Sequence, residues 1–251
     1  MHILITNDDG IRAEGLIQLV ACAVKAGHRV TVCAPDSERS AASHSISITK
    51  PLRVKEGELY GMKTYAVDGT PADCARLGMY LLKDDKPDFC ISGINRGSNL
   101  GGACIYSGTV GAAMEASMAG CPALASSLRS FTQSDYSAAA EITVRVAEWA
   151  VSHPLSRGAV YNLNVPALPI GNILGVKKTQ VLAPAYLTEA RYESFVSEYN
   201  NTYYFLTDGE SSVTYPEDSD DILNEKGWAT VSALSWDLSH KPGMDDIDIS
   251  L

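Results

Sequence analysis

The sequence predicts an α/β protein with a mostly parallel sheet that is covered by helices on both faces. Two observations lead to this prediction. Through residues 1–166, short apolar runs alternate with segments whose apolar residues recur at helical spacing. The first two apolar runs, His2–Thr6 and Arg29–Ala34, flank one such segment and form a strand–helix–strand unit. The two strands of such a unit lie parallel and are joined by a right-handed crossover.

The next elements follow from local signals. The helix of the first unit ends at Gly27, because glycine is typical just after a helix. The polar, serine-rich stretch Pro35–Lys50 is predicted as a loop, and short strands near Leu52–Lys55 and Lys63–Val67 indicate a hairpin. A second helix begins at Thr70-Pro71-Ala72-Asp73, which combines a threonine cap, a proline at the first helical position and a capping-box acid.

The alternation continues to the last core strand and then stops. The expected elements are a strand at Asp88–Ser92, a glycine-rich loop at Gly93–Gly108, a helix at Thr109–Met118, a strand at Pro122–Leu128, a helix at Ala138–Val151 and a strand at Ala159–Val165. We therefore predict a core at 1–182 and a C-terminal extension at 183–251. The extension is rich in aromatics, carries one strand at Gly227–Trp236 and ends in an acidic tail at 237–251.

Composition excludes several classes of partner. The formal net charge of −10 argues against binding a nucleic-acid polymer through its phosphates. No apolar run approaches the ~18 residues of a membrane span, and Asp8 comes too early for a signal peptide. We therefore expect no membrane association and a cytoplasmic location. The six cysteines form no C-x-x-C pair, which disfavours a zinc or redox site.

The most informative motif is Asn7-Asp8-Asp9-Gly10, which follows the first strand directly. In an open α/β sheet, ligands bind outside the carboxyl ends of the strands. Two adjacent carboxylates there repel each other unless a cation or a shared proton separates them. We interpret Asp8 and Asp9 as candidate metal ligands. The alternative is that the motif only forms a turn and caps the next helix, as Asn and Asp often do.

Two further strands end in side chains with oxygen atoms. These side chains are Asp36, Ser37, Glu38 and Ser40 after the second strand, and Ser92, Asn95 and Asn99 after a later one. In a doubly wound sheet the ends of these strands share one edge. Carboxylate, amide and hydroxyl oxygens suit hard cations such as Mg²⁺ or Mn²⁺. The convergence predicts a divalent metal site at this edge.

A candidate anion site lies beside it. Ser107, Gly108 and Thr109 end the glycine-rich loop and open a helix. Helix N-termini offer unpaired N–H groups and a positive partial charge to phosphate, although ordinary capping explains the same residues. Three arginines lie near this edge: Arg12, Arg39 and Arg96. Each is expected either to add a charge-assisted hydrogen bond to the anion or to form a solvated surface ion pair.

His44 lies in the predicted loop Pro35–Lys50, here called the second loop, which faces the same edge of the sheet. Histidine is the usual acid or base near neutral pH, so His44 is a candidate proton donor to a leaving group. A structural role is the more common one for a lone histidine. Tyr106 is the nearest aromatic that could stack on a base.

Other frameworks fit less well. The chain lacks G-x-G-x-x-G after the first strand, Gly-Lys-Ser/Thr and G-x-S-x-G, which disfavours a dinucleotide oxidoreductase, a Walker ATPase and an α/β-hydrolase. A phospho-acceptor signalling domain also places paired acids after a first strand to hold Mg²⁺. It needs a phosphorylatable aspartate at the end of a central strand, where this chain has Gly93-Ile94-Asn95. This alternative and that of a general small-molecule phosphatase stay open.

Taken together, the motifs resemble the survival protein SurE family over residues 1–166. The matching segments are Asn7–Gly10, Ala34–Asp36 with Glu38–Ala41, Gly69–Asp73, Ser92–Asn95 with Gly97 and Asn99, Tyr106–Ala113 and Asn162–Pro166. Several motifs in family order are far more specific than one. The chain departs from the family pattern after Leu182, where a basic segment is replaced by Ala190–Ser194 and Thr202–Phe205.

The resemblance implies a Rossmann-like three-layer α/β/α sandwich and a metal-dependent phosphomonoesterase, a 5′- and in some members 3′-nucleotidase that acts on nucleoside monophosphates. Some members also trim polyphosphate. It implies one divalent ion per subunit, Mg²⁺ or Mn²⁺, held by Asp8, Asp9, Ser40 and Asn95. The expected catalytic residues for hydrolysis of the phosphoester are Asp8, Asp9 and His44. Asn95 and Arg96 join the helix N-terminus in holding phosphate. It also implies a homodimer or homotetramer that exchanges the C-terminal segment.

Overall fold

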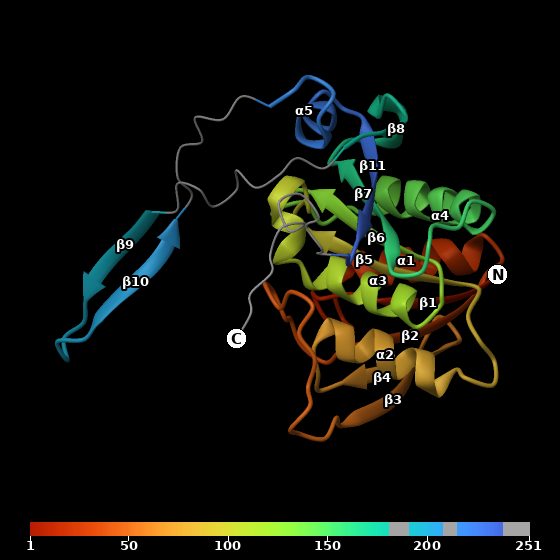
Figure 1. The fold of residues 1–251 in the computed structure, drawn as a ribbon, viewed down its shortest axis with the longest axis horizontal. Coiled ribbons are helices and arrows are strands. Elements are labelled where there is room, and N and C mark those ends of the chain that lie inside the picture. Colours follow the sequence, from red (N-terminus) through yellow and green to blue (C-terminus); the bar gives the residue numbers. More distant parts are fainter. Residues whose placement is uncertain (181–190, 208–214, 238–251) are drawn as a thin grey trace, which may run out of the picture.

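A computed structural model describes residues 1–180, 191–207 and 215–237. Their dominant feature is a nine-stranded sheet, shown in Figure 1. In sheet order its strands are β3 (Val54–Leu59), β4 (Met62–Val67), β2 (Arg29–Pro35), β1 (His2–Thr6), β5 (Phe89–Arg96), β6 (Ala123–Arg129), β7 (Ala159–Pro166), β11 (Ala229–Ser235) and β8 (Val176–Lys178). The predicted acidic tail and the boundary at residue 182 lie outside the described residues.

The strand order reverses at the centre of the sheet. β1 pairs in parallel with β2 on one side and with β5 on the other. The chain builds outward from β1 through β2 to β4, then crosses to β5, β6 and β7, and all these neighbours are parallel. In a doubly wound sheet, ligands bind at the carboxyl ends of the strands where the order reverses. The segments that follow β1 and β5 therefore define the expected site.

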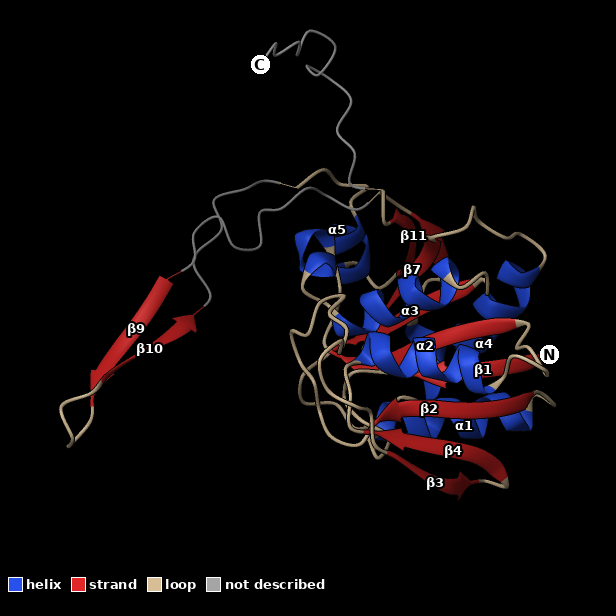
Figure 2. Ribbon diagram, turned by 60° about the horizontal axis from the view of Figure 1, so that its bottom comes forward, coloured by secondary structure: helices blue, strands red, loops and turns tan. Residues whose placement is uncertain are grey.

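Helices cover both faces, as Figure 2 shows. The alternating side chains of β1 explain the two layers, because successive residues of a strand point to opposite faces. Ile3 and Ile5 join the core under α1 (Glu14–Lys25) and α4 (Ser137–Val151). Leu4 joins the other core, under α2 (Pro71–Leu81) and α3 (Gly108–Met118). The predicted three-layer α/β/α fold with a mostly parallel sheet is confirmed.

Two strands differ from their predicted bounds. β5 continues to Arg96, where a loop was expected after Ser92, because Gly93 has a φ of +149° that accommodates an irregularity in the pairing with β6. The hairpin strand β3 extends to Leu59 and turns at Tyr60 and Gly61, both at positive φ. β3 is an exposed edge strand with charged residues, so it gave little apolar signal.

The C-terminal part returns to the sheet. α5 (Asp220–Glu225) packs beside β11, and β11 pairs antiparallel with β7 and parallel with β8. The strand predicted at Gly227–Trp236 therefore belongs to the same sheet as the core strands. Pairing between segments that are distant in the sequence leaves no local pattern, so the sequence did not place this strand in the sheet. Only the antiparallel hairpin of β9 (Arg191–Val196) and β10 (Thr202–Thr207) stands apart in Figure 1.

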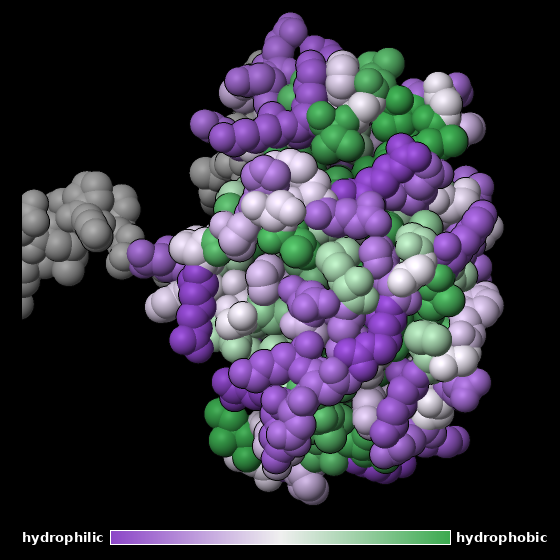
Figure 3. Space-filling view, turned by 90° about the vertical axis from the view of Figure 1, so that its right-hand side faces the viewer, coloured by the Kyte–Doolittle hydropathy of each residue, from purple (hydrophilic) through white to green (hydrophobic). Residues whose placement is uncertain are grey.

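A second surface feature lies between α4 and the β8–β11 edge. A cavity of about 800 Å³ is lined mostly by apolar side chains, among them Val146, Trp149 and Ile173. Figure 3 shows hydrophobic residues gathered among hydrophilic ones toward the top of the face it views. The cavity contains none of the predicted site residues. No helix in the described ranges is long and apolar enough to cross a membrane.

Candidate metal and phosphate site

The turn after β1 is formed by Asn7. Its Nδ2 donates to the carbonyl of Gly10 at 2.9 Å, and its Oδ1 accepts from the Gly10 N–H at 3.2 Å. Asn7 is fully buried, so its role is to close the turn. The turn function considered for the whole motif therefore falls to Asn7, and the two carboxylates that follow are available for other contacts.

Asp8 faces the N-terminus of α3. Both its oxygens accept from Thr109, one from the hydroxyl and the other from the N–H at 3.2 Å. Burial is the main cause that raises the pKa of Asp8, against the lowering effect of these bonds. Gly108 permits the approach, since a Cβ there would lie 3.0 Å from the Asp8 Cβ. Ser107 caps the helix by accepting from the Val110 N–H.

These contacts change the expected role of the helix N-terminus. Thr109 was predicted to bind phosphate, but in this structure its N–H and hydroxyl are directed at Asp8. The Val110 N–H is likewise engaged, by Ser107. In this structure Thr109 therefore orients the Asp8 carboxylate and Ser107 caps the helix. Contact of these residues with phosphate stays a prediction.

Asp9 has a different environment. Its Oδ2 accepts from the backbone N–H of Arg96 at 2.9 Å. Burial raises the pKa of Asp9 to about 6, and the negative charge of Asp8 adds to the rise. Asp9 lines a cavity of about 350 Å³ together with Glu38, Arg96 and Tyr136. Of the two aspartates, Asp9 is thus the one with open space beside it.

Ser40 and Arg96 meet at Glu38. The Ser40 hydroxyl donates to one Glu38 oxygen at 2.6 Å, and the Arg96 guanidinium lies 3.5 Å from the other. The charge of Glu38 also contributes to the raised pKa of both Asp8 and Asp9. Glu38 is a site residue that the sequence placed at the right edge without giving it a role.

Asn95 lies at the end of β5. Its Nδ2 donates to the carbonyl of Gly97 at 2.7 Å, which assigns the orientation of the amide and leaves Oδ1 as an acceptor for other partners. The bulge after Ser92 and the register with β6 carry Asn95 to this position. The strand ends that hold Asp8, Asp9 and Asn95 are neighbours in the sheet.

The second loop is attached to both neighbouring segments. The Arg39 N–H donates to the Asp8 carbonyl at 2.8 Å, and the Ser43 N–H donates to the Tyr106 carbonyl at 3.0 Å. Gly111 allows the loop to lie against α3, since a Cβ there would be 2.6 Å from the Ser43 carbonyl oxygen. The loop that carries Ser40 and His44 is therefore packed on the helix that begins at Ser107.

His44 forms an ion pair that the sequence did not predict. Its Nε2 lies 2.9 Å from Glu115 of α3, and the other Glu115 oxygen accepts from Arg76 of α2 at 2.7 Å. The hydrogen bond from His44 is the main cause that lowers the pKa of Glu115. Glu115 is one charged residue in a helix of small and apolar neighbours, which was the only sequence signal for it.

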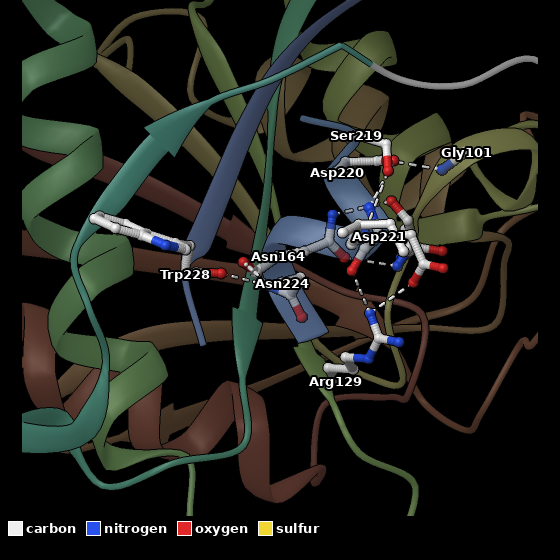
Figure 4. Close-up of polar contacts among 10 residues, drawn as sticks. Gly101, Arg129, Asn164, Ser219, Asp220, Asp221, Asn224 and Trp228 are labelled. Carbon is white, nitrogen blue, oxygen red and sulfur yellow. Dashed lines mark hydrogen bonds and ion pairs between the residues drawn. The ribbon is translucent and has the colours of Figure 1, made fainter. Parts of the chain in front are cut away.

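A buried polar network supports the glycine-rich loop from behind. Both Asn162 and Asn164 donate to the Asn99 carbonyl, and the Asn164 side chain accepts from the Asn99 N–H at 2.8 Å. Figure 4 shows how α5 joins this network: Asp220 accepts from the Gly101 N–H at 3.0 Å, and Asn224 donates to the Asn164 carbonyl. The C-terminal segment thus contacts the loop that leads to Ser107.

The residues at the strand ends fit a hard divalent cation. Asp8 and Asp9 supply one buried and one half-buried carboxylate, and in both, burial raises the pKa by disfavouring the charged form. Ser40 and Asn95 supply a hydroxyl and an amide oxygen, ligands that Mg²⁺ and Mn²⁺ accept. Among the described residues, no three His, Cys, Asp or Glu side chains converge as a metal-binding group. A site here therefore needs the serine and asparagine as well.

Comparison with known proteins identifies the family of the chain. The family model "Survival protein SurE" matches residues 3–187. A "5′-nucleotidase SurE" of Gloeobacter violaceus is 38% identical over 97% of this chain and 93% of its own length. One from Prochlorococcus marinus is 41% identical over 82% of this chain and 77% of its own. The crystal structure of the SurE protein from Aquifex aeolicus superposes with a TM-score of 0.85 at 32% identity, covering 98% of each chain. The chain belongs to the SurE family.

Proposed function

We propose that this protein is a 5′-nucleotidase that hydrolyses nucleoside monophosphates with one divalent metal ion, Mg²⁺ or Mn²⁺, per subunit. One observation carries the proposal: two adjacent carboxylates lie at the point of sheet reversal, and one of them, Asp9, lines a cavity together with Arg96. The relatives named 5′-nucleotidase, which match nearly the whole chain, support the substrate class. Asp8, Asp9, Ser40 and Asn95 would hold the metal.

The proposed roles follow from the contacts of each side chain. When bound, the metal supplies Lewis-acid polarisation of the phosphate and a more acidic water. Asp8 is fixed by Thr109, so it serves as a ligand in a set position. Asp9 has one oxygen occupied by the Arg96 N–H, and its Oδ1 accepts the proton of the attacking water. Arg96, beside Asp9 in the cavity, and Asn95 orient the phosphate.

Cleavage then needs a proton for the leaving group. The water oxygen forms a bond to phosphorus as the bond from phosphorus to the ribose oxygen breaks, and His44 protonates that oxygen. The Ser107 hydroxyl and the Gly108 N–H at the start of α3 would stabilise charge on the phosphoryl oxygens. Tyr106, which has a half-exposed ring beside the second loop, is the proposed stacking surface for the base.

A hydrolysis assay tests the proposal. Purified protein with Mn²⁺ or Mg²⁺ should release phosphate from nucleoside 5′-monophosphates, and EDTA should abolish release until metal is restored. Full activity in EDTA would overturn the metal role. Parallel assays with 3′-monophosphates, short polyphosphates and sugar phosphates determine the substrate range of the enzyme. Equal rates on sugar phosphates would make the enzyme a general phosphatase, and stoichiometric phosphorylation of an aspartate without turnover would favour a signalling role.

We also propose that the protein is a homodimer or homotetramer joined through the β9–β10 hairpin. Phe195 stacks on Tyr203 and Phe205 within the hairpin, at ring distances of 5.0 and 5.7 Å. These rings remain about half exposed, and nearly every residue of both strands is exposed. Exposed apolar patches of this kind mark interfaces. Exchange of this segment with a second copy of the chain would cover them.

A further inference from the structure

Glu115 is a buried carboxylate that takes no part in the proposed chemistry. It is 5% exposed, on the face of α3 that contacts α2 and the second loop. Its two oxygens accept from His44 Nε2 at 2.9 Å and from Arg76 Nε at 2.7 Å. A buried carboxylate is costly unless it is paired. The hydrogen bond from His44, followed by the bond from Arg76, holds the pKa of Glu115 below its usual range, so Glu115 is ionised near neutral pH.

We propose that Glu115 is a positioning residue, which fixes the imidazole of His44 and holds the loop that carries Ser40 against α3. The proposal rests on the proposed function for the role of His44. Backbone bonds of Arg39 and Ser43 and the bond from the Ser43 hydroxyl to the Ile105 carbonyl also hold this loop, and further along it the Ser47 N–H donates to Asp73. The bond between His44 and Glu115 joins the loop to a side chain of α3.

The hydrogen bond to Glu115 also determines which ring nitrogen of His44 carries a hydrogen. An ionised carboxylate can only accept, so Nε2 must carry a hydrogen, and Nδ1 is the nitrogen left to meet the leaving group. In the neutral ring with hydrogen on Nε2, Nδ1 has none to donate. Proton donation to the leaving group therefore requires imidazolium. The charged groups that face His44 across this pairing are Glu115 from α3 and, behind it, Arg76 from α2.

Two variants with opposite changes of charge test the proposal. Glu115→Gln keeps one acceptor for Nε2–H but loses the negative charge, while Arg76→Gln removes an exposed positive charge and leaves Glu115 to His44. Glu115→Gln should lower kcat roughly 10- to 100-fold with little change in KM, the range found for residues that orient a reacting ligand from behind. Arg76→Gln should lower kcat less, because Glu115 can still accept from His44. A kcat of Glu115→Gln equal to that of the wild type, or no greater a loss than in Arg76→Gln, would overturn the proposal.

A measurement without turnover separates this proposal from the proposed function. Side-chain ¹⁵N–¹H NMR of the histidines, assigned with His44→Gln, should show neutral His44 with its hydrogen on Nε2 in the wild-type protein and a mixture of tautomers in Glu115→Ala. Hydrogen on Nδ1 in the wild type, or an unchanged tautomer in a folded Glu115→Ala protein, would contradict the proposal. If the wild type hydrolyses no nucleotide, the proposed function fails, while this spectrum still decides whether Glu115 fixes His44.

Discussion

Asp8 and Asp9 are neighbours in the chain but have different surroundings. Asp8 points to α3 and accepts two bonds from Thr109, whereas Asp9 accepts one backbone bond and lines a cavity. Successive residues after a strand point to opposite faces, so adjacency itself separates their roles. The sequence predicted both as ligands, but only the packing of α3 and the bulge of β5 distinguish the held carboxylate from the open one.

Asp8→Asn should remove most activity without unfolding the protein. The amide keeps the shape and can still accept one bond from Thr109, but it lacks the charge that a divalent ion needs. Because burial raises the pKa of Asp8, losing the charge should leave the free energy of unfolding of metal-free protein unchanged or higher. We expect kcat/KM to fall by at least about 100-fold, in line with loss of a metal ligand. Turnover close to wild type at limiting Mn²⁺ would refute the ligand assignment.

Metal affinity should depend on pH through Asp9. Its pKa in the folded protein, about 6, lies above the usual value of about 3.9 for an aspartate, so the native state binds this proton more tightly than the unfolded chain. Below pH 6 a metal ion must displace the proton, and affinity for Mn²⁺ should fall by up to about tenfold per pH unit. Above pH 6 this group adds no dependence. Titration calorimetry with Mn²⁺ on metal-free protein at several pH values measures this dependence of the affinity.

Asp9→Asn is the matched control for that titration. It should bind Mn²⁺ more weakly and lose the dependence between pH 5 and 6. The same pKa predicts that ionised Asp9 destabilises the metal-free fold as pH rises through about 4 to 6, so Asp9→Asn should gain stability at pH 7 and little at pH 4. Equal pH slopes in wild type and variant would show that another group titrates.

At the scale of elements, α5 supports the glycine-rich loop. Asp220 is almost fully buried and accepts from the Gly101 N–H, while its neighbour Asp221 pairs with the half-exposed Arg129. Asp220→Ala removes the acceptor of a partly buried N–H, so we expect a loss of about 1 kcal/mol in the free energy of unfolding, because the removal of a buried charge offsets part of the lost bond. Asp221→Ala, the control, should lose less, because a partly exposed ion pair contributes little. Urea unfolding of both proteins tests the difference, and equal losses would contradict it.

The elements also show what sequence can predict. The strands β1, β2, β6 and β7 and the helices between them have strong apolar periodicity, and each lies within a residue or two of its expected bounds. β9, β10 and α5 were not expected. Their exposed or mixed residues give no period, and what holds α5 is a contact with Gly101, more than a hundred residues away. Pairings such as His44 with Glu115 depend equally on the fold.

At the scale of the whole molecule, the proposed assembly depends on the β9–β10 hairpin. Replacing residues 191–207 by a short Gly-Ser linker removes the stacked aromatics but no strand of the nine-stranded sheet. We expect light scattering to give at least twice the monomer mass for the full chain and a lower mass for the variant, with circular dichroism unchanged. A full-length protein that is monomeric at micromolar concentration would contradict the proposed assembly.

The return of β11 to the sheet has a consequence for the order of events during biogenesis. Because β8 lies before the hairpin and β11 after it, and both belong to one sheet, each chain can complete its sheet without a second copy. In the proposed oligomer, subunits would therefore associate after each has folded, through a hairpin whose two ends are both connected to the completed sheet. Refolding should therefore show a first phase whose rate is independent of protein concentration, followed by a slower bimolecular phase that concentration accelerates.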